Sequence, residues 1–203
     1  MASCTADLRF AQDIMDGYRP SVSLFGDSFP RRLMPWLREI QDQFGFQFVE
    51  NYAVGGSQAF NHWERYVSRR NPRHTNLAIV WVGSNDIDSH WGPSTPAQTT
   101  ASYVEDLYLE LTSRGYLVFV LGIPGRYRCR CLHSRSYSRL SCGCNQYLMG
   151  QLRANFIKLP PGSYMENRYA DDRIHFTDDH FREVARKIYY RICNTLLGQF
   201  RNE

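Results

Sequence analysis

Short hydrophobic runs alternate with helix-like patterns along this chain. Four runs are rich in β-branched or aromatic residues and are bounded by Gly, Asn or Pro, and they cover 22–25, 46–54, 77–82 and 116–123. Such runs are typical of strands. Because most of them are apolar at consecutive rather than alternate positions, we expect both faces of these strands to be buried, as in a parallel sheet.

Apolar residues between and after these runs recur at helical spacing. The three stripes are Leu33, Trp36, Leu37, Ile40 and Phe44; Val104, Leu107, Tyr108 and Leu111; and Phe181, Val184, Ala185, Ile188, Ile192 and Leu196. Thr177 is placed to cap the last helix, and Asp178 and Asp179 match the positive end of its dipole. Pro35 predicts that the first helix starts late or carries a turn at its entry.

The alternation of strands and helices predicts an α/β fold, a three-layer α/β/α sandwich around a parallel sheet of about five strands. We expect the fifth strand in 163–169. With 203 residues, of which 43% are hydrophobic, the chain is predicted to form a single domain over 1–203. The ligand site of such a sheet lies beyond the carboxyl ends of its strands.

Polar segments follow three of the predicted strands. Ser28 stands in the segment GDSF after the first strand, the segment NYAVGGS of 51–57 follows the second, and GSND with Asn85 follows the third. Asp172 and His175 stand just before the last helix. Because the carboxyl ends of parallel strands meet at one edge of the sheet, we expect these residues to lie together.

These residue types together predict nucleophilic catalysis. A serine hydroxyl attacks well only when an imidazole takes its proton, and a carboxylate orients that imidazole. Ser28, His175 and Asp172 supply these three roles. The backbone N–H groups of Ser28 and Gly56 and the side-chain amide of Asn85 are candidate oxyanion donors. Each short motif alone is also ordinary turn chemistry, so the prediction rests on their order and placement together.

The four segments resemble the motifs of the SGNH, or GDSL, hydrolases, in that family's order. They are GDSF with Ser28, AVGGS with Gly56, GSND with Asn85, and DRIH with Asp172 and His175. The resemblance implies a flavodoxin-like α/β/α fold and a serine hydrolase of acetyl or lipid-acyl esters that needs no cofactor for catalysis. The run 26–33 also resembles SGNH domains carried in proteins of mobile genetic elements. A catalytically weak or inactive domain on the same fold is the alternative.

A cysteine-rich insertion is predicted at about 125–145, in the loop after the fourth strand. It contains two C-x-C pairs, which are Cys129 with Cys131 and Cys142 with Cys144. Four thiolates on two such clips could hold a structural Zn²⁺, with His133 able to replace one sulfur. Two disulfides or free thiols are the alternatives.

The same insertion is basic and contains Arg126, Arg128, Arg130, Arg135 and Arg139, with Tyr127 and Tyr137 among them. No Asp or Glu occurs from 111 to 165. Arginines interleaved with aromatic residues are typical of surfaces that bind nucleic acid. The second hypothesis is therefore a weak or inactive SGNH module that binds nucleic acid or anionic membrane through this loop, and a merely solvated loop is the plainer alternative. A net charge of +4 permits such a partner without requiring one.

The longest apolar runs, 77–82 and 116–121, are too short to span a bilayer. The first residues do not show a basic region followed by an apolar one, so we expect no secretory signal and an intracellular location, cytoplasmic or nuclear. That expectation would not apply to a domain excised from a longer protein. The expected substrate is a small acyl ester or a lipid.

Overall fold

Five parallel strands form one sheet in the computed structural model of the protein. They are β1 (Val22–Gly26), β2 (Val49–Asn51), β3 (Leu77–Trp81), β4 (Leu117–Leu121) and β5 (Phe156–Ile157). Their order is β2-β1-β3-β4-β5, and every pairing is parallel. The structure describes residues 21–44, 49–62, 77–88, 95–125, 132–163, 165–172 and 174–196. The flavodoxin-like sheet predicted from the sequence is confirmed.

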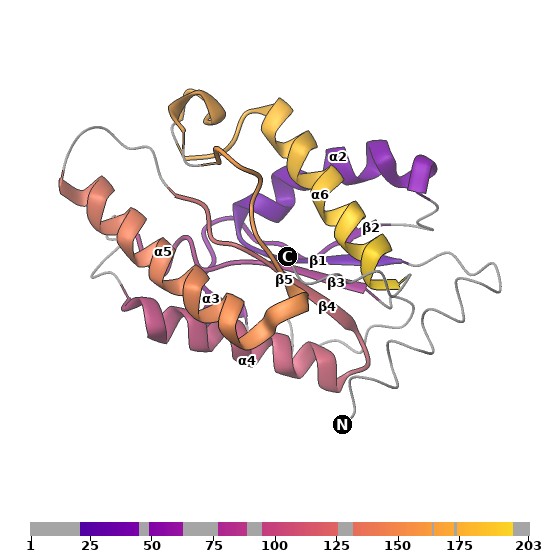
Figure 1. The fold of residues 1–203 in the computed structure, drawn as a ribbon, viewed down its shortest axis with the longest axis horizontal. Helices are drawn as coiled ribbons and strands as arrows, with labels where there is room; N and C mark the ends of the chain where they lie inside the picture. The colour runs from indigo at the N-terminus through magenta and orange to yellow at the C-terminus, as the bar shows by residue number, and fades with distance from the viewer. Residues whose placement is uncertain are drawn as a thin grey trace.

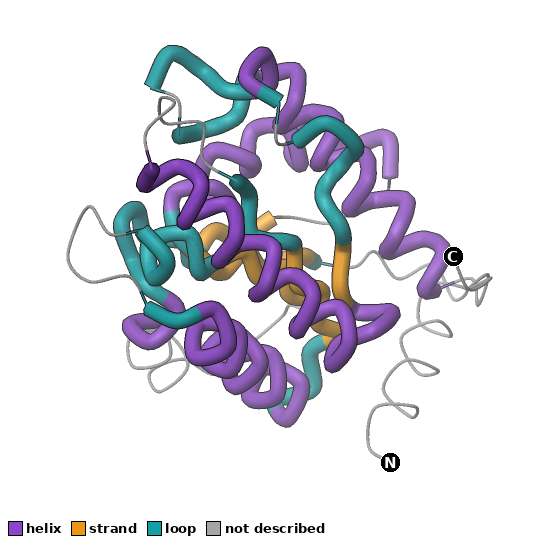
Figure 2. Tube along the Cα trace, turned by 60° about the vertical axis from the view of Figure 1, so that its left-hand side comes forward, coloured by secondary structure: helices purple, strands orange, loops and turns teal. Residues whose placement is uncertain are grey.

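Helices cover both faces of the sheet. Helices α2 (Ser28–Phe44) and α6 (Asp178–Leu196) lie on one face, and α4 (Ala97–Ser113) and α5 (Leu132–Leu152) on the other, with the short α3 (Ala59–His62) beside α4 (Figure 1). Figure 2 shows the strands between these two helical layers. Among the described residues, no helix is both long and apolar enough to cross a membrane.

The alternating side chains of the central strand build two separate cores. Leu77, Ile79 and Trp81 of β3 pack into the core under α2 and α6, whereas Ala78 and Val80 pack into the core under α4 and α5. All five residues are at most 1% exposed. A strand covered on both faces must be apolar at every position, which is the pattern that identified β3 in the sequence.

The order of strands places the ligand site between β1 and β3. The chain moves outward from β1 to β2 and then returns across β1 to β3, so the connections after β1 and β3 diverge at their carboxyl ends. In sheets of this kind, ligands bind at this switch point. The loops predicted to carry the catalytic residues leave the sheet there.

The predicted position of the fifth strand was wrong. Segment 163–169 contains a 3₁₀ turn at Glu166–Arg168, and among its described residues Tyr169 alone makes a bridge, with Phe176. The real edge strand is the two-residue β5, which is too short to produce a recognisable pattern and is followed by Pro160 and Pro161.

The prediction that Pro35 delays the first helix was also wrong. Helix α2 begins at Ser28 and contains Pro35 in its interior. Proline removes one backbone hydrogen bond there. The helix nevertheless continues, because Leu33, Leu37 and Ile40 are buried against the sheet on both sides of the proline.

The insertion expected as a loop is helical from Leu132 onward. The inward face of α5 packs on α4 and consists of Tyr137, Ser141, Cys144, Leu148 and Leu152. Their spacing of three or four residues is that of one helical face. Because this face includes a serine and a cysteine, its apolar stripe was not evident in the sequence.

Candidate active site

The nucleophile candidate stands in a tight turn between β1 and α2. Gly26 has a φ of +150°, and a Cβ at this position would lie 1.9 Å from the carbonyl oxygen of Trp81. Only glycine fits that approach. The Asp27 N–H donates to the same carbonyl at 3.3 Å, which ties the turn to β3. Ser28 then becomes the first residue of α2.

Asp27 joins this turn to the loop after β3. Its buried carboxylate accepts a hydrogen bond from the Phe29 N–H at 3.0 Å and another from the Ser84 hydroxyl. The first bond caps the start of α2. The bond between Asp27 and Ser84 links two of the four motifs directly.

A hairpin-like loop before α6 presents the proposed base. An antiparallel bridge joins Tyr169 to Phe176, and the Ala170 N–H donates to the His175 carbonyl at 2.8 Å. Within the loop, Asp172 Oδ1 accepts hydrogen bonds from the backbone N–H groups of Ile174 and His175, both at 2.9 Å. These bonds hold Asp172 and His175 on one side of a compact turn.

The structure brings the three predicted catalytic side chains together. His175 Nε2 lies 2.6 Å from Ser28 Oγ, and His175 Nδ1 lies 2.7 Å from Asp172 Oδ2. A carboxylate can only accept, so Nδ1 carries a hydrogen, and Nε2 of neutral His175 then accepts the Ser28 hydroxyl hydrogen. We call this chain, from Ser28 through His175 to Asp172, the open relay.

Asp172 is held in its charged form. Partial burial alone would raise its pKa, but the hydrogen bonds from the His175 backbone, the His175 ring and the Ile174 backbone outweigh burial and lower the pKa to about 2. The Arg32 guanidinium lies 3.4 Å from Asp172 Oδ2. Asp172 is therefore ionised throughout the neutral pH range and can stabilise a positive charge on His175.

The loops that carry Gly56 and Asn85 are bonded to one another and to the Ser28 turn. The Val54 N–H donates to the Gly26 carbonyl at 2.9 Å, and Asn85 Nδ2 donates to the Ser57 carbonyl at 3.0 Å. Gly56 has a φ of +77°, and a Cβ built on it meets nothing within 4 Å. The structure thus places both predicted oxyanion residues in loops beside Ser28, and their role as donors stays a prediction.

Asp86, the last residue of the GSND motif, supports the Gly56 loop. Both of its carboxylate oxygens accept from the Ala59 N–H, at 3.1 and 2.9 Å, at the start of α3. Burial raises the pKa of Asp86 to about 6, although backbone hydrogen bonds from Ala59 and Phe60 act in the opposite direction. The sequence analysis assigned no role to this carboxylate.

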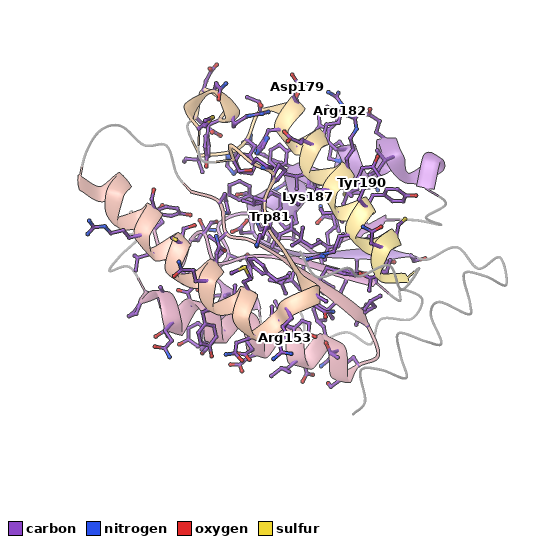
Figure 3. The ribbon with its side chains drawn as sticks, viewed as in Figure 1. Trp81, Arg153, Asp179, Arg182, Lys187 and Tyr190 are labelled. Carbon is purple, nitrogen blue, oxygen red and sulfur yellow. The ribbon has the colours of Figure 1, made fainter. Side chains whose placement is uncertain are left out.

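The aromatic residue of GDSF packs directly against the proposed base. The ring centroids of Phe29 and His175 are 5.2 Å apart, and Phe29 also contacts Trp81, Phe176 and Phe181. Trp81 lies in the interior of the molecule (Figure 3). Phe29, the residue after Ser28, therefore restricts the orientation of the His175 ring. The apolar character of Phe29 alone did not predict this contact.

A cleft of about 940 Å³ opens beside the open relay. Ser28 and His175 both line it, so the Ser28 hydroxyl is accessible to a small-molecule ligand. One wall is formed by α2, and the other by the hairpin-like loop and the start of α6.

His180 of α6, a second histidine with a serine and a carboxylate as neighbours, is in a different environment. Its side chain is 0% exposed, and it contacts Ser163 Oγ through Nε2 at 2.7 Å and Glu183 Oε2 through Nδ1 at 3.1 Å. We call this chain, from Ser163 through His180 to Glu183, the buried relay. The side chain of His133, predicted as a possible zinc ligand, lies outside the described residues.

The zinc site predicted from four cysteines is not supported. Cys142 and Cys144 lie on α5 rather than in a loop, and residues two apart on a helix face different directions. Cys142 is exposed, whereas Cys144 is buried and donates to the Ala97 carbonyl at 3.0 Å. Burial and the nearby charge of Asp86 raise the pKa of Cys144 to about 12. Cys129 and Cys131 lie outside the described residues.

The described residues hold no group of three or more His, Cys, Asp or Glu side chains placed to bind a metal ion. Both Cys142 and Cys144 are free thiols. The part of the chain that the structure describes therefore gives no support to the predicted structural Zn²⁺.

One of the two tyrosines predicted to lie on a basic, nucleic-acid-binding surface is buried instead. Tyr137 is 4% exposed and faces the core, so it is not available to stack on a base. Arg139 is exposed on α5. Arg126, Arg128 and Arg130 lie outside the described residues, as does the side chain of Arg135.

Comparison of the sequence with protein-family models and with curated proteins found no match. The structure is similar to solved structures of esterases and lipases. The acetyl xylan esterase AlAXEase matches with a TM-score of 0.68 at 17% identity, covering 85% of this chain and 99% of that chain. A lipase/acylhydrolase from Enterococcus faecalis matches with a TM-score of 0.67 at 16% identity, covering 91% and 98%.

A GDSL-like lipase from Bacteroides thetaiotaomicron matches with a TM-score of 0.66 at 12% identity, covering 96% of this chain and 98% of that chain. These likenesses extend over nearly the whole of each related structure. The chain therefore has the three-layer fold of the SGNH, or GDSL, hydrolases, as the four motifs predicted.

Proposed function

We propose that this protein is a serine ester hydrolase in which Ser28 is the nucleophile, His175 the general base and Asp172 the carboxylate that orients it. The observation that carries the proposal is the open relay, with its distances of 2.6 and 2.7 Å, at the edge of a ligand-sized cleft. The ester class is supported by the fold that this chain shares with an acetyl xylan esterase and a lipase/acylhydrolase.

The first half of the reaction transfers the acyl group to the enzyme. His175 Nε2 takes the hydroxyl proton as Ser28 Oγ attacks the ester carbonyl carbon. The tetrahedral intermediate then collapses, the bond to the alcohol oxygen breaks, and His175 returns the proton to the departing alkoxide. Ionised Asp172 stabilises the positive charge that His175 carries between these two transfers.

The second half releases the acid. A water molecule attacks the acyl carbon and gives its proton to His175, and the bond to Ser28 Oγ breaks as the serine regains a proton. Both tetrahedral intermediates carry a negative oxygen. The N–H groups of Ser28 and Gly56 and the Asn85 amide are the proposed donors to it, and loss of one such donor typically lowers the rate by about 10²–10³.

The test is turnover of 4-nitrophenyl acetate by wild type and by Ser28→Ala. We expect the variant to lose activity by about 10⁵-fold or more, because no other group forms the acyl-enzyme. Ser113→Ala is the matched control, since Ser113 is an exposed serine at the end of α4 whose hydroxyl donates to the Glu110 carbonyl. Undiminished turnover in a folded Ser28→Ala protein would exclude Ser28 as the nucleophile.

A further inference from the structure

The wall of the cleft formed by α2 is a single stripe of that helix. Its members are Ser28, Arg31, Arg32, Pro35 and Trp36. They stand at positions i, i+3, i+4, i+7 and i+8, which lie on one face of a helix. The two arginines are therefore one turn beyond the nucleophile on the same side, so their guanidinium groups can reach a ligand bound to Ser28.

The two arginines differ in their partners. Arg32 is paired with Asp172 of the open relay at 3.4 Å. Among the described residues, no carboxylate lies within ion-pair distance of Arg31, whose side chain is exposed. Arg31 thus presents five N–H donors and a full positive charge to the cleft.

The position of the cleft indicates which half of an ester it holds. His175 must protonate the departing alkoxide, so the alcohol lies on the side of Ser28 where His175 stands. The cleft is on this side, because His175, Phe176 and Thr177 line it. Of the proposed oxyanion donors, Gly56 and Asn85 do not line the cleft, whereas Ser28 and Gly55, the neighbour of Gly56, do, so the cleft also reaches the edge of the oxyanion side.

We propose that the enzyme selects esters whose alcohol half carries an anionic oxygen group, a carboxylate or a phosphate, and that Arg31 binds this group. The inference rests on the proposed ester hydrolase function and names its substrate class. Guanidinium groups bind both kinds of oxyanion through paired N–H donors. Arg31 is a specificity residue here and takes no part in proton transfer.

The opposite wall carries two acidic residues that bear on this assignment. Asp171 and Asp178 line the cleft and are exposed. Asp178 is the first residue of α6, where the helix dipole offsets its charge. Arg182 of α6 lies 4.4 Å from the centroid of the Trp36 ring of α2, so the two helices beside the cleft are in contact. A cationic alcohol would favour the acidic wall, so the experiment includes one.

The experiment compares four acetate esters that differ in one substituent. They are 3-carboxyphenyl acetate, 3-acetoxyphenyl phosphate, the neutral methyl 3-acetoxybenzoate and the cationic 3-(trimethylammonio)phenyl acetate. Each kcat/KM is divided by the rate of the same ester with imidazole, a neutral nucleophile, which removes differences in leaving-group reactivity without adding a charge effect of its own. The carboxylate and phosphate esters distinguish the two kinds of anion.

We expect wild type to prefer at least one anionic ester over the neutral ester by about tenfold, the size of one charge-assisted hydrogen bond. Arg31→Gln should bring this ratio close to one, Arg31→Lys should restore part of it, and added salt should reduce it in wild type. The matched control is Arg38→Gln, which removes an exposed arginine of α2 outside the cleft and should leave the ratio unchanged.

Three results would overturn this inference while leaving the proposed hydrolase in place. They are equal use of anionic and neutral esters by wild type, preference for the cationic ester, and an anion preference that persists in Arg31→Gln. Hydrolysis of none of the four esters would overturn this inference, and failure to hydrolyse 4-nitrophenyl acetate as well would overturn the proposed function with it.

Discussion

Two hydrogen-bonded chains of serine, histidine and carboxylate stand out among the described residues, and we propose a catalytic role for one of them. Their members are Ser28, His175 and Asp172 in the open relay, and Ser163, His180 and Glu183 in the buried relay. The distances from histidine to serine are 2.6 and 2.7 Å, and those from histidine to carboxylate are 2.7 and 3.1 Å. Hydrogen-bond geometry alone therefore barely separates them.

Access and competing partners separate them clearly. Ser163 and His180 are both 0% exposed, whereas Ser28 and His175 line the cleft. The Ser163 hydroxyl also lies 2.7 Å from the Pro160 carbonyl, an acceptor that competes with His180 for its single hydrogen. A triad of residue types becomes a reactive nucleophile only where a substrate can reach it.

The buried relay instead supports the loop that carries the open one. It joins α6 to the segment before the hairpin-like loop, and the Tyr169 hydroxyl lies 2.9 Å from the Ser163 carbonyl and 2.6 Å from that of Gly125. His180 also packs edge-on against Phe176, the last residue of the bridge that closes the loop. We infer that the buried relay stabilises the fold and the open relay performs the chemistry.

The largest expected difference between the two relays appears when each histidine is replaced in turn. His175→Gln should lower kcat for 4-nitrophenyl acetate by about 10⁵-fold or more, since the base is lost. His180→Gln should retain activity within about tenfold but melt at a lower temperature, because a buried polar side chain loses a partner at a cost of about 1–3 kcal/mol. Steady-state kinetics and thermal unfolding measure the two effects. Comparable losses of kcat in two folded variants would contradict the division of roles.

The carboxylates provide the next contrast. Asp172→Asn should lower kcat by about 10³–10⁴-fold, because the amide neither fixes the His175 tautomer nor stabilises its charge. Glu183→Gln is the matched control, since Glu183 is 41% exposed and Asp172 is 36% exposed. We expect the control to change kcat by less than about threefold. Equal loss of activity in both variants would show that the two carboxylates do not differ in role, contrary to the division between the open and the buried relay.

Much of the open relay was predictable from the sequence, because its residues stand in motifs at predicted strand and helix ends. The alternation of apolar runs located β1, β3, β4 and α6 and hence the edge of the sheet where the motifs meet. The bonds of Arg32 to Asp172 and of Ser84 to Asp27 were not predictable, since they depend on side-chain placement across elements distant in sequence.

The elements that the sequence did not reveal were hidden by two physical features, buried polar residues and a very short strand. Helix α5 buries Ser141 and Cys144, whose polarity hides its inward stripe, and β5 is only two residues long. The buried relay was missed for a similar reason. Ser163 and His180 are polar residues that the fold encloses completely, and hydropathy patterns place such residues on the surface.

The smallest effect that separates the relays is the pH dependence of stability. Burial lowers the pKa of His180 below its ordinary value of 6.5, an effect that the charge of Arg168 reinforces and Glu183 opposes. A lowered histidine pKa means that the unfolded chain binds the proton more readily. The contribution of His180 to stability is therefore complete above about pH 6.5 and is lost as the pH falls through the folded-state pKa.

Wild type should thus lose unfolding free energy below about pH 6.5 by an additional amount of at most about 1.4 kcal/mol per pH unit from this one group. His180→Gln should remove that component, so the stability of the variant should fall less steeply between pH 6.5 and 5. Urea unfolding of both proteins at a series of pH values measures the two unfolding free energies. Subtracting one from the other cancels the contributions of the other titratable groups. Parallel stability curves would show that His180 does not titrate differently in the folded state, and the buried relay would then lose its assigned energetic role.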